Sequence, residues 1–252
     1  MSPNLQPLND PALTIPMGVF GRLSSINKFG ALDPIPVDTP TDVWDGGGLY
    51  PFPTSAVITN VSQTADQVAN RGALIEVQGL DADWNQVIQT VALDAADTTT
   101  AVALGTPLLR CFRMILKGDT PCDSTIRAHN AAESVDYAII SVGANQTLMA
   151  VYTVPANKTA FMTSYFVSNI DTATRTPKST EILLQAITNT DSSIRTVKHA
   201  NAIPEAGPPL QHFFNPYYRF QEKTDIVINV ECAFADGHVH AGFDIILWDS
   251  PE

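Results

Sequence analysis

Basic residues are scarce in this sequence of 252 residues. Lys and Arg together number 14 against 26 for Asp and Glu, which gives a formal net charge of −12. An acidic surface repels a phosphate backbone, so nucleic acid is not expected as a direct partner. Apolar runs of 18 or more residues are also missing, and the first residues show neither the basic region nor the apolar run of a secretion signal. We therefore expect no contact with membranes.

Cysteine is almost as scarce, with only Cys111, Cys122 and Cys232. An odd number this small excludes a disulfide framework. Cys111 and Cys232 lie in apolar, strand-like runs, which predicts buried and reduced thiols. Alternation places Cys232 on one strand face with Ile226, Ile228, Val230 and Phe234.

Helical patterns are few, whereas 18 Pro, 14 Gly and abundant Thr and Val favour short strands separated by turns. We expect a mainly β protein with two β-sandwich or jelly-roll-like units, residues 54–130 and 131–252. The proline-rich stretch 201–220 is expected to be a loop. The strands expected are 56–61, 73–78, 86–93, 108–117, 137–142, 147–154, 159–168, 180–188, 194–199, 225–234 and 239–248.

The first 53 residues form a segment of their own, in which nine prolines restrict the backbone to extended conformations. Apolar residues nevertheless recur through it, which is unusual for a disordered tail. We expect an extended N-terminal arm that docks on neighbouring subunits. Its expected partner contacts are Leu13, Ile15, Phe20, Trp44, Tyr50 and Phe52.

Motifs for catalysis are missing. The sequence contains no Gly-x-Ser-x-Gly turn, and Gly46-Gly47-Gly48 lacks the Lys-Ser/Thr of a phosphate loop. Paired carboxylates for glycoside hydrolysis cannot be recognised from one sequence, because their separation is a tertiary property. We expect no enzymatic activity and no cofactor.

Two motifs have partial metal-ligand spacing. Asp81, Asp83 and Asn85 match the start of a calcium loop, but the sixth and twelfth positions lack the Gly and Glu of an EF-hand. A polar hairpin turn is the favoured alternative. His238 and His240 share one face of a strand, yet no third ligand is identifiable; two exposed or interface imidazoles, or a weak pH sensor, are the alternatives. No metal site is predicted.

Three segments together resemble β-rich virion structural proteins of tailed bacteriophages, in particular those of marine phages. They share the spacing of their strands and short stretches of sequence with that group, but no catalytic motif. The resemblance implies a non-enzymatic role in the particle, in a symmetric oligomer. The segments are Arg71–Leu93, Gln146–Asn169 and Tyr217–Trp248.

The function expected is that of a virion structural protein assembled in the host bacterial cytoplasm. Capsid decoration or cement is preferred over a head–tail or tail-associated role, and the arm and sheet edges are the expected contacts. Partners would be further copies of the chain, with a trimer as one candidate, and the major capsid or head–tail proteins. The alternative is a carbohydrate- or host-receptor-binding module, since aromatic residues such as those of 212–218 offer stacking surfaces.

Overall fold

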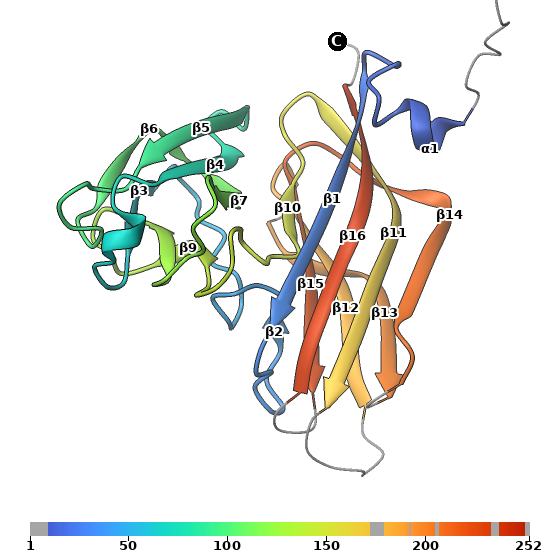
Figure 1. Ribbon diagram of the computed structural model, residues 1–252. Coiled ribbons are helices and arrows are strands. Elements are labelled where there is room, and N and C mark those ends of the chain that lie inside the picture. The colour runs from blue at the N-terminus through green and yellow to red at the C-terminus, as the bar shows by residue number, and fades with distance from the viewer. Residues whose placement is uncertain (1–9, 172–178, 192, 205–206, 233–236, 250–252) are drawn as a thin grey trace, which may run out of the picture.

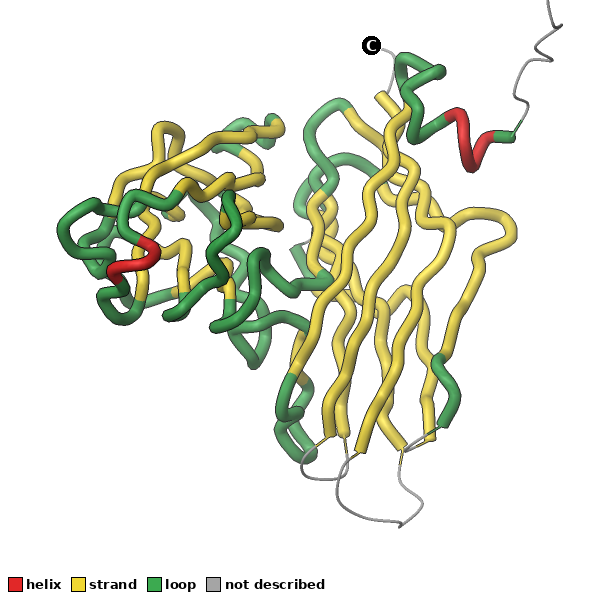
Figure 2. The backbone as a smooth tube through the Cα atoms, viewed as in Figure 1, coloured by secondary structure: helices red, strands yellow, loops and turns green. Residues whose placement is uncertain are grey.

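The computed structural model describes residues 10–171, 179–191, 193–204, 207–232 and 237–249. These residues form almost only strands and loops, as the sequence predicts (Figures 1 and 2). The helical turns are α1 (Pro11–Thr14) and the 3₁₀ turn η1 (Val68–Asn70). No helix in the described ranges is both long and apolar enough to cross a membrane.

The larger unit is a sandwich of two antiparallel sheets (Figure 1). One sheet has the order β1-β16-β11-β14, and the other has the order β10-β15-β12-β13 with the short β2 paired to β15. The strands of the first sheet are β1 (Leu23–Leu32), β16 (Gly237–Asp249), β11 (Lys158–Asp171) and β14 (Leu210–Phe220). Those of the second are β10 (Val151–Thr153), β15 (Thr224–Cys232), β12 (Ser179–Thr188), β13 (Arg195–Pro204) and β2 (Thr41–Asp42).

The smaller unit also has two antiparallel sheets, of order β6-β3-β8-β9 and β5-β4-β7. It lies beside the sandwich (Figure 1) and has its own apolar core, which includes Ile58, Ile75 and Met114. Its strands are β3 (Ile58–Gln63), β4 (Leu74–Leu80), β5 (Gln86–Ala92), β6 (Val102–Leu108), β7 (Arg110–Leu116), β8 (Ile126–His129) and β9 (Asp136–Ile140).

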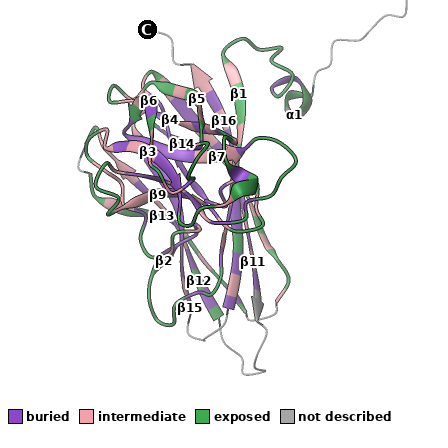
Figure 3. Cartoon of the chain, turned by 60° about the vertical axis from the view of Figure 1, so that its left-hand side comes forward, coloured by how far each residue is buried: buried purple, intermediate pink, exposed green. Residues whose placement is uncertain are grey.

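Strand β15 shows how the sequence pattern produces the packing. Ile226, Ile228 and Cys232 face the sandwich core, whereas Val227 packs into the core of the smaller unit. Both faces are therefore covered, which explains the nearly unbroken apolar run (purple in Figure 3). The expected facing of Cys232 is confirmed, while Phe234 lies outside the described residues.

All three cysteines are buried and unpaired. Burial is confirmed for Cys111 and Cys232, which are 1% and 0% exposed. Desolvation raises the pKa of the Cys111 thiol to about 12, so the reactive thiolate is disfavoured. Cys122 is buried as well, although its sequence surroundings are polar.

The structure corrects the expected arm for residues 23–53. Strand β1 pairs with β16 along its whole length, from Leu23 opposite Trp248 to Leu32 opposite Val239. The chain between Pro16 and Pro34 contains no proline, which leaves room for this edge strand. Farther on, Ile35 and Val43 are buried in the sandwich core. This part of the chain belongs to its own fold.

The unit boundaries also differ from those expected. Strand β9 pairs with β8, so the smaller unit continues past residue 130 to at least Ile140. The sandwich contains strands from both ends of the chain, because β1 and β2 pair with β16 and β15. The other strands of the sandwich all lie at Val151 or later in the chain. Pairings between residues more than 180 positions apart leave no signal in local composition.

Strand β14 occupies most of the stretch expected to be a loop. It pairs with β11 at the edge of its sheet, where proline is tolerated because one side of the strand needs no ladder bonds. The register shifts between Met162 and Ser164, whose partners are Tyr218 and Phe213. Residues 214–217 have no partner in the register with β11, so this irregularity accommodates Pro216 within the strand.

Lys28 of β1 is a buried cation at the edge where the two units meet. Lys28 is 3% exposed, and its Nζ donates a hydrogen bond to the carbonyl oxygen of Phe112. The same Nζ lies 5.8 Å from the centroid of the Phe112 ring. Among the described residues, no carboxylate forms an ion pair with it. Burial lowers its pKa well below 10.5.

We expect Lys28→Met to raise the free energy of unfolding by about 1–3 kcal/mol at pH 7, because it removes the cost of burying an amine. Between the folded-state pKa and the unfolded value of 10.5, the unfolded chain binds more protons, so wild-type stability rises with pH. The advantage of the variant should shrink accordingly in urea unfolding at pH 10. The exposed Lys117→Met is the control, with little change at either pH. An equal gain at both values would contradict this explanation.

Candidate functional site

The two partial metal motifs have different surroundings. Asp81 Oδ1 accepts hydrogen bonds from the backbone N–H groups of Asp83 and Asn85, both at 2.9 Å, which is the polar hairpin turn favoured as the alternative to a calcium loop. His238 Nδ1 lies 3.0 Å from Asp33 Oδ2. In the described ranges, no group of three His, Cys, Asp or Glu side chains could hold a metal ion.

The expected partner contacts divide into two groups. Leu13 and Phe20 are exposed, at 45% and 46%. Ile15, Trp44 and Tyr50 are buried within their own chain, at 6%, 4% and 3% exposure, which corrects their assignment. Phe52 belongs with them, because it is partly buried against the core of the smaller unit.

Trp44, Tyr50 and Phe52 form an aromatic stack that links the arm to the smaller unit. The Tyr50 ring makes edge contacts with Trp44 at 5.1 Å and Phe52 at 4.7 Å between centroids. The Tyr50 hydroxyl donates to the Cys111 carbonyl oxygen at 2.9 Å. Apolar residues of a proline-rich segment can thus serve an intramolecular core, which sequence alone does not distinguish from a docking role.

An apolar surface remains around the N-terminal segment. It consists of the exposed side chains of residues 13–20 and, on β14, the exposed Phe213 and Tyr217, at 66% and 54%. A groove of about 560 Å³ separates α1 from the outer face of the first sheet, with Ile15, Ile26 and Phe213 among its lining residues. We call this the N-terminal apolar surface; its exposed members are Leu13, Met17, Val19, Phe20, Phe213 and Tyr217.

The two segments that supply the exposed apolar side chains carry no charge, and Asp244 is the charged residue among those that line the groove. Residues 11–21 and 210–218 contain no Asp, Glu, Lys or Arg. In a chain of net charge −12, most other surfaces of two copies would repel each other. Large apolar patches of this kind mark interaction sites more often than ordinary surface.

The aromatic residues of 212–218 do not form a single stacking platform. Phe214 is 9% exposed and packs against His199, His212 and Tyr165, whereas Phe213 points outward. The Tyr165 hydroxyl lies 2.8 Å from His199 Nδ1. Burial and the neighbouring His212 lower the pKa of His199. This cluster joins β13 to β14 and closes one edge of the sandwich.

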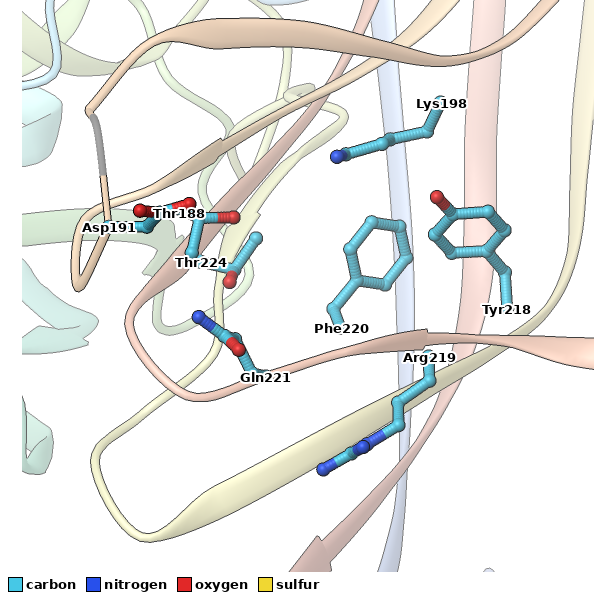
Figure 4. A pocket seen from close by; sticks show the side chains of 8 residues that line it. All are labelled: Thr188, Asp191, Lys198, Tyr218, Arg219, Phe220, Gln221 and Thr224. Atoms are coloured by element: carbon cyan, nitrogen blue, oxygen red, sulfur yellow. The ribbon is translucent and has the colours of Figure 1, made fainter.

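A second, polar hollow lies where β14 turns into β15 (Figure 4). Its volume is about 240 Å³, and residues from β12, β13, β14 and β15 line it. Sequence reasoning missed this site because its residues are up to 36 positions apart and belong to no motif. They are Thr188, Asp191, Lys198, Tyr218, Arg219, Phe220, Gln221 and Thr224.

Comparisons with known proteins add no family. No family model matches the sequence, and no curated protein matches it. Among solved structures, one of the infectious bursal disease virus Gt strain aligns with 92% of this chain and 78% of that chain, at 8% identity and a TM-score of 0.14. A score this low carries no argument about fold or function.

Proposed function

We propose that the protein is a non-catalytic structural subunit of a virus particle, of the tailed-phage kind that the sequence resembles. It would assemble with further copies of itself through the N-terminal apolar surface, as a capsid decoration or a tail-associated component. One observation supports assembly: residues 11–21 and 210–218 expose apolar side chains and contain no charged residue.

The occupant proposed for this surface is a second copy of the chain. Charge favours it, because two acidic chains repel each other least where neither carries charge. Exposed aromatic and aliphatic side chains such as Phe213 and Met17 are the kind that form the centre of a stable interface.

We expect the full chain to form an oligomer at micromolar concentration. The double variant Leu13→Asp with Phe213→Asp should be a monomer, because association would bury each new carboxylate against the apolar surface of the second copy. Sedimentation velocity over a concentration series measures the mass. The matched control is Ile88→Asp, which places a carboxylate at another exposed apolar residue, 61% exposed, on β5 of the smaller unit. A wild-type monomer throughout, or an oligomer unchanged by the double variant, would contradict self-assembly by this surface.

The alternative function, a carbohydrate- or receptor-binding module, is favoured by a different observation, the polar hollow at the end of the sandwich. Binding there and assembly through the N-terminal apolar surface are compatible, because the hollow and the apolar groove share no lining residue.

A further inference from the structure

The polar hollow has a polar rim beside two aromatic side chains, of which Tyr218 is partly exposed and Phe220, at 3% exposure, belongs to the sandwich core. The rings of Tyr218 and Phe220 lie 4.9 Å apart between centroids. Figure 4 shows Lys198 extended alongside these rings, with Thr188 and Thr224 across the hollow. Sugar rings bind to surfaces of this composition, since their C–H faces pack on aromatic rings and their hydroxyl groups need hydrogen-bonding partners.

Thr224 supplies an independent observation that points to a ligand site. It is 1% exposed, and its Oγ1 is buried without a hydrogen-bond partner in the described structure. A buried hydroxyl is normally paired, because leaving it unpaired costs about 1–3 kcal/mol in desolvation. Its position on the wall of the hollow provides a place from which a polar ligand group could satisfy it.

The hollow contains two cations without an ion-pair partner. Six of the twelve described Lys and Arg residues form ion pairs, whereas Lys198 and Arg219 form none within the described residues. Asp191 is the carboxylate that lines the same hollow. The ion pairs elsewhere are Arg71–Asp66, Arg110–Asp225, Lys117–Glu76, Arg127–Glu133, Lys158–Asp249 and Arg195–Asp42.

A neighbouring hollow extends the site. It measures about 350 Å³ and shares Arg219 and Gln221 with the first. Gln221 Nε2 donates to Thr190 Oγ1 at 2.8 Å, which holds the amide between the two hollows. Two adjoining hollows of this size suit two consecutive units of a glycan better than one small ion.

We infer that the two hollows bind a glycan that carries a carboxylate, that is, an acidic sugar. Lys198 would pair with the carboxylate in the first hollow, whereas Arg219, which Figure 4 shows on the opposite side of β14, would serve the adjoining hollow. Asp191 and Gln221 would bind sugar hydroxyl groups, and Thr224 would gain a hydrogen-bond partner. This inference deepens the alternative function given above and does not depend on self-assembly.

The test uses the full chain and isothermal titration with N-acetylneuraminic acid and with digalacturonate, alongside galactose and inorganic phosphate. We expect binding of at least one acidic sugar, with galactose and phosphate at least about tenfold weaker. Lys198→Met should weaken acidic-sugar binding by about tenfold, since it removes a charged hydrogen-bond donor. Arg22→Met, which removes an exposed, unpaired cation elsewhere, is the matched control and should change nothing.

Thr224→Val distinguishes a ligand-binding role from a structural one. The substitution keeps the shape of the side chain and removes an unpaired hydroxyl, so the melting temperature should not fall, whereas affinity should fall several-fold. Equal affinity for galactose, equal affinity for phosphate, or no binding of either acidic sugar would overturn the inference. None of these results bears on the sedimentation experiment, so failure of this proposal and failure of self-assembly are distinguishable.

Discussion

Arg110→Met is expected to lower the free energy of unfolding by about 3–5 kcal/mol, because it leaves a buried carboxylate without its cation. Arg110 and Asp225 lie between the two units with side chains 4% and 0% exposed. Two parallel hydrogen bonds join them, from Arg110 Nε to Asp225 Oδ1 at 2.8 Å and from the terminal guanidinium nitrogen to Oδ2 at 2.9 Å. Urea unfolding at pH 7 measures the loss.

The surroundings of this pair explain why the effect should be large. Asp225 also accepts hydrogen bonds from the Thr153 hydroxyl at 2.6 Å and from Asn189 Nδ2 at 2.7 Å. The Arg110 guanidinium lies 4.9 Å from the Trp84 ring centroid and 5.3 Å from that of Phe52. Loss of the cation therefore disturbs a network in which β7, β15 and the 53-residue N-terminal segment meet.

Arg71→Met is the matched control. Arg71 pairs with Asp66 on the surface, with side chains 33% and 34% exposed, and solvent screening leaves exposed ion pairs with little effect on stability. If Arg110→Met lowered the free energy of unfolding no more than Arg71→Met does, the buried pair would contribute no more to stability than a surface ion pair.

Deleting residues 1–45 is expected to abolish cooperative folding of the sandwich. The truncation removes all of β1 together with Leu32, Ile35, Val43 and Trp44, which are 0–6% exposed. At about 1.5–3 kcal/mol for each large apolar side chain, the loss is roughly 6–12 kcal/mol, comparable to the whole net stability of a domain. Circular dichroism with thermal unfolding measures the result.

Deleting residues 1–22 is the control truncation, because it ends before β1. In the described part of the deleted segment, Thr14 and Ile15 are the buried side chains, so the sandwich should still unfold cooperatively. A folded, cooperative 1–45 truncation would show that β1 is dispensable and would restore the docking-arm interpretation for residues 23–45.

Local sequence patterns already predict much of the β architecture. Alternation in β15 placed Cys232 on the core face, and this holds because side chains on a strand have a period of two whatever the strand pairs with. The 81–85 turn followed from the capacity of an aspartate to accept hydrogen bonds from backbone amides close to it in sequence. Both properties depend on residues within a few positions of each other.

The tertiary structure decided what depends on distant partners. Strand β1 exists because β16, more than 200 residues away, supplies its hydrogen bonds, and β14 exists because β11 offers an edge with a bulge for Pro216. The same holds for the candidate sites: Lys198 and Thr224 share one hollow, and Phe20 stays exposed while Trp44 is buried. The sequence by itself determined a mainly β protein and the facing of β15; long-range pairing determined where the units divide and which polar and apolar groups remain open for binding.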